Sequence, residues 1–303
     1  MKTTAEPPFI SVVIASVNGA PSILKCLDAL VSQQGDVPYE ILVMDRCGES
    51  VRQAIAERFP QPQVLVAGFE GMPSIPKLRA LGMARARGAV VAILEDHCNV
   101  NPKWMTTAFR LHESGQRVMG GPVENGATSL VDWAVFYVEY ARFMPPVPFG
   151  VVDAVAGSSA LYDRALLETI GPELKDDVWE SFMHQRMKEM GVDFWCEPDL
   201  RVIHDKEFGF GYFMSQRYHY SRAFAGMRLA GAPAWKRLAY AAATPLLPPL
   251  LVLRMARLVL PKPGHASRFA ATLPLVLTFM ASYAWGEAVG ALLGPGDSLA
   301  RVE

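Results

Sequence analysis

The feature that most constrains this chain is the alternation of strand-like and helix-like segments over residues 1–235. Ile10–Ser16 is a continuous apolar run rich in β-branched residues, as expected for a strand buried on both faces. Apolar residues then recur at helical spacing over 23–31, and Tyr39–Asp45 forms a second buried strand. This alternation predicts a single layered α/β domain with a mixed, largely parallel sheet.

The same alternation continues downstream of the second strand. Strands are predicted at 63–67, 89–95 and 117–121, and helices at 76–85 and 102–111. The last helix is expected to begin at Pro102 with Asn101 as its N-cap, because proline is tolerated at the first helical position.

A second module is predicted at residues 236–303, where apolar residues are concentrated. Residues 269–293 carry a single charge, Glu287, and as a helix would reach about 37 Å, enough for a transmembrane span. Residues 241–253 are shorter and rich in proline, which favours a re-entrant or interfacial segment. Lysine and arginine flank that segment on both sides, so both flanks are expected in the cytoplasm. Two packed helices of a soluble domain are the alternative.

Composition excludes several other classes. The chain of 303 residues has 29 Lys and Arg against 30 Asp and Glu, so it lacks the basic field of a nucleic-acid-binding protein. Its four cysteines are widely spaced, which argues against a zinc knuckle and a disulfide framework. The first nine residues contain no apolar core of a signal peptide.

Polar side chains follow three of the predicted strands, at the edge of the sheet where α/β proteins bind ligands. Ser16 and Asn18 follow the first strand, Asp45 ends the second, and Glu95, Asp96 and His97 close the strand at 89–95. Each of these residues could instead cap a helix or turn.

Glu95, Asp96 and His97 together favour a divalent cation, Mg²⁺ or Mn²⁺, that holds a diphosphate. His204 ends a further apolar strand and could complete a ligand set of oxygen and imidazole. A structural histidine that only forms hydrogen bonds is the alternative at this position.

The order and spacing of these motifs resemble the family 2 glycosyltransferases, which have the Rossmann-type GT-A fold. PFISVVIASVNG resembles their first strand and nucleotide loop, and EILVMD their second strand. The resemblance implies that Asp45 contacts the nucleoside of a sugar nucleotide. IPKLRALGMARARGAVVAILEDH resembles the stretch that leads to their metal motif and places Arg79 at the family's arginine.

The chain departs from the family pattern at two points. Ala80 replaces the usual asparagine, and the metal motif DxD is spelled Glu95, Asp96, His97. By the resemblance, Asp96 would contact the metal or the ribose, with His97 or Glu95 as the second ligand. A histidine ligand shifts the preference from Mg²⁺ toward Mn²⁺.

The resemblance extends to the acceptor side of the family's site. VAGSSALYDRALLETIGP would place Gly157 and Ser158 at the sugar pocket, and Glu180 takes the position of the catalytic base. Asp177 is a rival base, and a solvated helix residue is the alternative for Glu180. In FMSQRYHYSRAFAGMR the residues at diphosphate-binding positions are Gln216, Arg217 and Arg222. A helix at the membrane surface is an equally weighted interpretation of this segment.

The sequence thus predicts a metal-dependent inverting glycosyltransferase with a nucleotide-sugar donor and an acceptor hydroxyl or phosphate. Because a sugar-nucleotide site is joined to a membrane module, a lipid-linked acceptor and a catalytic domain on the cytoplasmic face are expected. Two alternatives stay open: a nucleotidyltransferase on the same fold, and a membrane scaffold that has lost the reaction.

Overall fold

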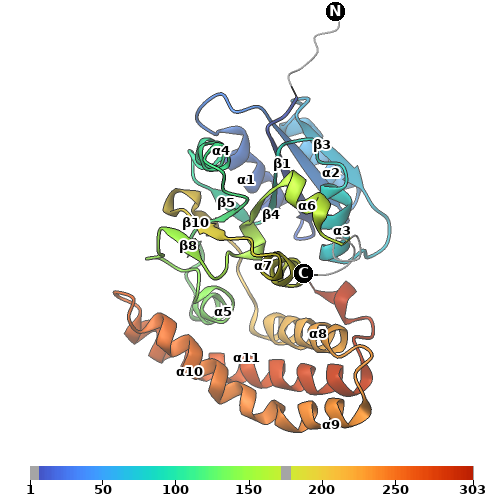
Figure 1. The fold of residues 1–303 in the computed structure, drawn as a ribbon, viewed down its shortest axis with the longest axis vertical. Helices are drawn as coiled ribbons and strands as arrows, with labels where there is room; N and C mark the ends of the chain where they lie inside the picture. Colours follow the sequence, from blue (N-terminus) through green and yellow to red (C-terminus); the bar gives the residue numbers. More distant parts are fainter. Residues whose placement is uncertain (1–6, 172–178, 303) are drawn as a thin grey trace, which may run out of the picture. The chain divides into compact units, whose positions relative to one another are not determined.

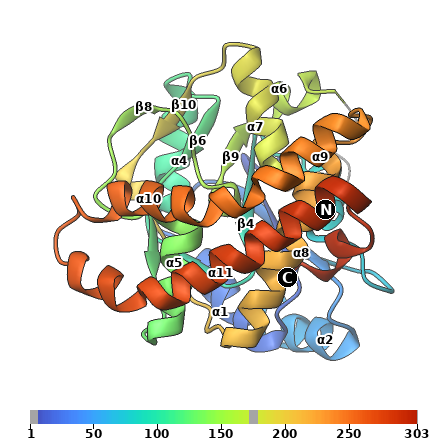
Figure 2. The ribbon, with the colours of Figure 1, turned by 90° about the horizontal axis from the view of Figure 1, so that it is seen from below.

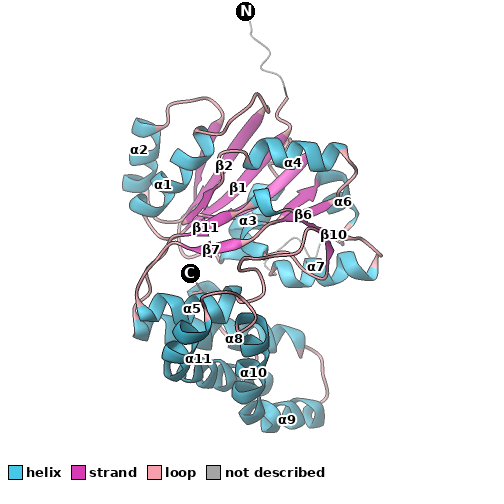
Figure 3. Cartoon of the chain, turned by 90° about the vertical axis from the view of Figure 1, so that its left-hand side faces the viewer, coloured by secondary structure: helices cyan, strands magenta, loops and turns pink. Residues whose placement is uncertain are grey.

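The computed structural model describes residues 7–171 and 179–302. The chain forms two compact units, one from Met1–Glu124 and Phe143–Asp205, the other from Asn125–Arg142 and Lys206–Glu303. Figure 3 shows that the first unit holds the sheets and that the second is built from helices. We call them the α/β unit and the helical unit. The boundary expected near residue 235 lies inside the helical unit, so the structure divides the chain differently.

An eight-stranded sheet in the order β3-β2-β1-β4-β9-β6-β10-β8 forms the core of the α/β unit (Figure 1). The strands are β1 (Ile10–Ser16), β2 (Tyr39–Asp45), β3 (Val64–Gly68), β4 (Val90–Glu95), β6 (Val118–Gly120), β8 (Gly150–Val152), β9 (Leu161–Asp163) and β10 (Phe194–Cys196). β3, β2, β1 and β4 are parallel, whereas β9 pairs antiparallel with β4 and β6. The predicted mixed, largely parallel sheet is confirmed.

A small sheet in the order β5-β11-β7 lies in the same unit. Its strands are β5 (Cys98–Val100), β7 (Val123–Asn125) and β11 (Val202–His204). β11 runs antiparallel to β5, with His204 directly opposite Cys98. This pairing brings the strand that ends at His204 next to the loop that follows β4.

The helices of the α/β unit are α1 (Ala20–Val31), α2 (Glu49–Arg58), α3 (Ile75–Met83), α4 (Trp104–Glu113), α6 (Arg164–Thr169) and α7 (Glu180–Glu189). α3 begins where Ser74 caps the backbone N–H of Lys77, and its Gly82 packs against Val13 of β1. The expected start of α4 at Pro102 is wrong, because the helix begins at Trp104. Asn101 instead closes a turn, with its Oδ1 accepting the N–H of Lys103 at 2.9 Å.

The helical unit contains α5 (Leu130–Tyr140), α8 (Phe210–Arg228), α9 (Ala234–Ala243), α10 (Leu247–Val259) and α11 (Ala266–Leu293). A short 3₁₀ turn joins α9 and α10, and the prolines expected to interrupt this region lie in first turns, where the missing N–H is tolerated. Residues 241–253 therefore belong to a longer helical segment. By length and composition, Ala234–Val259 and Ala266–Leu293 could each cross a membrane.

Candidate active site

The ends of β1, β2 and β4 meet at one edge of the large sheet. Ser16 pairs in register with Asp45, and Ala15 pairs with Glu95. The polar residues after these strands therefore share one edge, which is where ligands bind in open α/β sheets.

Asp45 is buried, and donors of the protein surround its carboxylate. Its Oδ1 accepts hydrogen bonds from Ser16 Oγ at 2.9 Å and from Cys47 N at 3.2 Å. Its Oδ2 accepts from Gly48 N at 3.2 Å and from Arg52 at 3.1 Å. These bonds fix the loop after β2, and the nucleoside contact of Asp45 stays a prediction.

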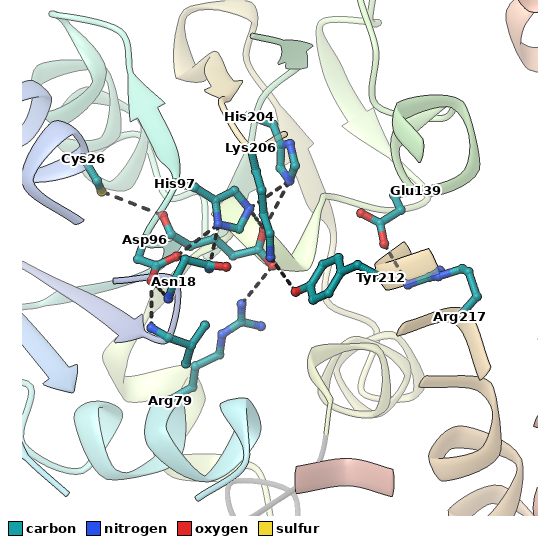
Figure 4. Close-up of polar contacts among 12 residues, drawn as sticks. Asn18, Cys26, Arg79, Asp96, His97, Glu139, His204, Lys206, Tyr212 and Arg217 are labelled. Atoms are coloured by element: carbon teal, nitrogen blue, oxygen red, sulfur yellow. Dashed lines mark hydrogen bonds and ion pairs between the residues drawn. The ribbon is translucent and has the colours of Figure 1, made fainter. Parts of the chain in front are cut away.

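Asp96 joins the loop after β1 to the loop after β4. Its Oδ2 accepts the backbone N–H groups of Val17 at 2.7 Å and Asn18 at 2.8 Å, and its Oδ1 accepts the Asn18 amide at 2.6 Å (Figure 4). Burial alone would raise the pKa of Asp96, but His97 and these N–H donors lower it. Asp96 is thus held as an anion that positions two loops.

His97 and His204 converge beside Asp96 (Figure 4), and Glu95 lies next to both rings. The Nε2 atoms of the two histidines are 2.9 Å apart, and Glu95 Oε2 lies 3.3 Å from that of His97 and 3.9 Å from that of His204. The other ring nitrogen of His97, Nδ1, is 3.0 Å from Asp96 Oδ1. That contact fixes the ring so that Nε2 faces His204.

Carboxylates set the charge of His97. Burial opposes the charged imidazolium, but Asp96 and Glu95 outweigh it and raise the pKa of His97 to about 9. Burial likewise acts against the charge of Glu95, and His97 and Arg79 hold the pKa of that carboxyl well below its usual range. The site therefore favours a positive charge at the Nε2 atom of His97.

The three converging residues fit a divalent cation. Ligand atoms about 2.1 Å from a metal lie about 3 Å from one another, close to the separations observed here. A carboxylate that fixes the second ring nitrogen is the usual support of a metal-binding histidine, and Asp96 supplies it. Imidazole with carboxylate suits Mn²⁺ and other borderline cations.

Cys98 belongs to this neighbourhood but was not predicted from the sequence. Its thiol, one atom of His97 and one of Glu95 all lie within 4.8 Å of one another. Burial raises the pKa of the Cys98 thiol well above its ordinary value, so it is neutral in this structure. Only its position after the metal motif could have indicated it.

Arg79 links Glu95 to Glu180 from the interior of the unit. Its guanidinium lies 3.2 Å from Glu95 Oε1 and 2.8 Å from Glu180 Oε1. Burial opposes the charge of Arg79, but the two carboxylates outweigh it and raise its pKa. Glu180 is only 5% exposed, so it is not the solvated helix residue that was considered as the alternative.

Gly157 and Ser158 lie on the same side of the unit as Glu180. A Cβ atom at Gly157 would be 3.1 Å from the Cβ of Glu180, so only glycine fits this approach without displacement. The hydroxyls of Ser158 and Ser159 are buried, and neither has a hydrogen-bond partner within residues 7–171 and 179–302. Buried hydroxyls of this kind can accept a partner such as water, an ion or a polar ligand.

The remaining predicted residues lie elsewhere. Gln216, Arg217 and Arg222 belong to α8 of the helical unit. There Gln216 donates to the carbonyl of Arg301, Arg217 pairs with Glu139 at 2.7 Å, and Arg222 contacts the carbonyl of Gly294. Asp177 lies outside the described residues.

The fold and the site define a class, the GT-A glycosyltransferases: a largely parallel sheet with an acidic and imidazole cluster at the ends of its strands. The sequence profile described as Glycosyl transferase family 2 matches residues 11–171. The chain belongs to this family.

Individual relatives agree with this assignment. Glycosyltransferase AglE of Haloferax volcanii is 29% identical over 136 residues, which are 42% of this chain and 44% of AglE. The chain thus covers less than half of the length of this relative. Among solved structures, mannosyltransferase PcManGT from Pyrobaculum calidifontis, in complex with GDP-Man and Mn²⁺, superposes with a TM-score of 0.56. TarS 1–349 of S. aureus in complex with UDP gives 0.50.

Both structural likenesses concern the fold alone, because sequence identity is low. PcManGT is 17% identical, with 92% of this chain and 88% of that chain covered. TarS is 14% identical, with 92% and 90% covered.

Proposed function

We propose that this chain is a metal-dependent inverting glycosyltransferase that moves a sugar from a nucleotide-diphosphate donor to an acceptor hydroxyl or phosphate. One observation carries the proposal: the Nε2 atoms of His97 and His204 lie 2.9 Å apart beside Glu95. Arg79 joins that group to the buried Glu180.

Glu95, His97 and His204 would hold the cation, and Asp96 would orient His97 without binding the metal. When bound, the cation would neutralise the charge that develops on the leaving diphosphate. Mn²⁺ is favoured over Mg²⁺ because two of the three ligands are imidazoles. The Mn²⁺ and GDP-Man in the complex of PcManGT are in line with this assignment.

Glu180 would act as the base. Its contact with Arg79, at 2.8 Å, orients the carboxylate so that it can take the proton of the acceptor hydroxyl. The acceptor oxygen then forms a bond to the anomeric carbon as the bond to the diphosphate breaks. Inversion requires no nucleophile from the protein, and Asp177 stays the rival base.

The donor would bind between the loops that Asp45 and Asp96 fix, with Ser16 and Asn18 on the nucleotide side. Gly157 and Ser158 would border the sugar, and the buried hydroxyl of Ser158 suits a sugar hydroxyl. The diphosphate roles of Gln216, Arg217 and Arg222 stay predictions, since each already contacts a residue of the helical unit.

The helical unit would attach the enzyme to a membrane, with the α/β unit on the cytoplasmic face. Two long apolar helical segments in this unit support the attachment. An acceptor that resides in the bilayer, such as a lipid phosphate, would explain why the two units are joined in one chain.

Calorimetric titration of the full chain with UDP, GDP and their sugars, with and without Mn²⁺, tests the proposal. We expect donor binding that Mn²⁺ strengthens and that the variant His204→Ala weakens. The matched control is His219→Ala, which removes a histidine of α8. Donor binding that does not depend on the metal would contradict the proposal, and the absence of nucleotide binding would favour a scaffold without catalytic activity.

A further inference from the structure

One long stretch of the helical unit is basic. Residues 208–286 contain no Asp or Glu, whereas nine Lys and Arg fall in the same stretch. The whole chain carries a formal charge of only -1, so this basic segment is balanced elsewhere. A long segment with cations alone is complementary to an anionic surface.

The segment α9–α10 exposes apolar side chains along one stripe. Leu246, Leu250 and Leu253 follow one another at helical spacing and are 62%, 59% and 49% exposed. Trp235 precedes them and is 71% exposed. Exposed apolar stripes of this length mark a surface that binds a partner or a membrane.

Lysine and arginine accompany this stripe. Lys236 lies in the first turn of α9, and Arg254 and Arg257 lie in the last turns of α10; all three are exposed. Long basic side chains in such positions reach from an apolar stripe to phosphate groups at the membrane surface. The combination fits anionic lipid better than an apolar protein surface.

α11 packs closely against α8. The two helices run parallel, because contacts that lie further along α11 also lie further along α8. The ring of Phe279 packs on those of Phe210 and Phe213, and Ser282 Oγ donates to the carbonyl of Met214. Further along, Gly286 lies against Tyr218 and Ser221, and Gly290 lies against Arg222. A Cβ atom at Gly290 would be 2.3 Å from the Arg222 carbonyl, so the backbones are in close contact.

This packing determines how α11 can meet a membrane. If α11 crossed the bilayer as it is packed here, α8 would cross with it and carry Arg217, Arg222 and Arg228 into the hydrocarbon. Arg217 and Arg228 are paired with Glu139 and Glu287, but moving these ion pairs into hydrocarbon would still cost the desolvation of every charge. Glu287 of α11 is also buried against Arg228 of α8, so its carboxylate forms an ion pair between the two helices. Figure 1 shows α8 and α9 on opposite sides of α11.

We propose that the helical unit binds one face of an anionic bilayer in the plane of the surface and that α11 does not cross it. The stripe Leu246, Leu250 and Leu253 enters the acyl boundary, and Lys236, Arg254 and Arg257 meet lipid phosphates. Figure 2 shows α9, α10 and α11 from the side that this binding would use. The inference refines the proposed membrane attachment and does not depend on the reaction.

Sedimentation of the full chain with vesicles tests the surface. We expect binding to vesicles of phosphatidylcholine mixed with phosphatidylglycerol. Binding should be at least about tenfold weaker to vesicles of phosphatidylcholine alone, and to the mixed vesicles at high salt. The double variant Leu250→Glu/Leu253→Glu should lose binding, whereas Leu65→Glu, at an exposed leucine of the α/β unit, should keep it. The double variant Arg254→Glu/Arg257→Glu should lose the preference for the anionic lipid.

Two outcomes of this experiment would overturn the inference. One is equal binding to both kinds of vesicle or to neither. The other is a dimer in light scattering that Leu250→Glu/Leu253→Glu converts to a monomer, because the stripe would then cover a second copy of the chain. No donor is used, so either result leaves the proposed reaction untouched.

Cysteine labelling tests whether α11 crosses. Ser267→Cys and Leu293→Cys lie at the two ends of α11, and both positions are exposed. Each is made with Cys47→Ser, because the other three cysteines are buried. In spheroplasts, we expect an impermeant maleimide to label both positions only after permeabilisation. Labelling of one end in intact spheroplasts would show a span and refute the inference.

Discussion

Each unit of the molecule buries a cluster of charged groups, and the two clusters differ in how their polar atoms are used. In the helical unit, Glu287 Oε2 accepts from Arg228 at 2.8 Å and from Tyr240 at 2.7 Å, and Oε1 accepts from Tyr283 at 2.8 Å. Donors from α8, α9 and α11 therefore satisfy this carboxylate. Such a cluster fastens helices together.

In the α/β unit, two imidazole nitrogens face each other at 2.9 Å, next to the carboxylate of Glu95. A single proton can form only one hydrogen bond among these atoms, whereas one cation could bind both Nε2 atoms and the carboxylate of Glu95. Buried charge alone therefore does not identify a site. The proposed cation site rests instead on three possible ligand atoms that lie close together.

Among the variants that test this comparison, the largest effect on activity is expected at Glu180. The variant Glu180→Gln keeps the shape of the side chain but cannot take a proton, so we expect kcat to fall about 10²- to 10⁴-fold. Donor affinity, measured by calorimetry, should change little. Glu189→Gln, at an exposed glutamate of the same helix, is the control. Unchanged turnover in Glu180→Gln would exclude it as the base.

A second prediction concerns His184, a buried histidine of the α/β unit outside the cluster. Its Nε2 is 2.7 Å from the hydroxyl of Tyr162, and burial, with Lys188 nearby, lowers the pKa of His184 to about 4. Its stabilising contribution is thus complete above pH ~6.5 and is lost as the pH falls toward 4, because the unfolded chain then binds the proton more tightly. The loss is at most about 3 kcal/mol.

Urea unfolding between pH 4 and 7 measures this contribution. The variant His184→Gln can still bond to Tyr162 but does not titrate, so its free energy of unfolding should depend less on pH. Equal slopes for the two proteins would mean that His184 is not held neutral. His97 is buried to a similar degree but is held charged, which shows that the carboxylates, not burial, distinguish the site.

The local features of the fold were predictable from the sequence. The bounds of β1 and β2 were predicted to the residue, because short, largely apolar runs mark strands buried on both faces. The start of α4 was missed, because the local preference of Asn101 and Pro102 also suits the turn that forms there. Such turns and caps use the same residue types.

Contacts between distant segments were not predictable. Arg79 and Glu180 are 101 positions apart, and no periodic pattern in the sequence indicates that they pair. The extent of the helical unit was missed for the same reason: α5 lies far from α11 in the sequence, yet the rings of Tyr137 and Phe269 pack against each other. The edge of the sheet could be predicted because parallel strands must end together, whereas side-chain pairs across it depend on packing.

Asp96 offers a sharper test of the cluster in the α/β unit. The variant Asp96→Asn removes the charge that orients His97, so we expect Mn²⁺ affinity to fall about 10- to 100-fold. Titration calorimetry with Mn²⁺ alone measures this loss. Asp199→Asn, at an exposed position of the same unit, should bind Mn²⁺ as the unmodified chain does. An unchanged affinity in Asp96→Asn would mean that His97 needs no support from this carboxylate.

The smallest effect is expected in the helical unit, where the variant Glu287→Gln removes the charge of the second cluster. Arg228 is 38% exposed, so solvent screens part of the loss, and we expect the free energy of unfolding to fall by about 1 kcal/mol. Urea unfolding measures this change, and Mn²⁺ affinity should stay the same. Because Asp96→Asn is expected to show the reverse pattern, the pair of variants separates a cluster that fastens helices from one that binds a ligand. A loss of Mn²⁺ affinity in Glu287→Gln would contradict that separation, since the carboxylate would then act on the site as well as on its own helices.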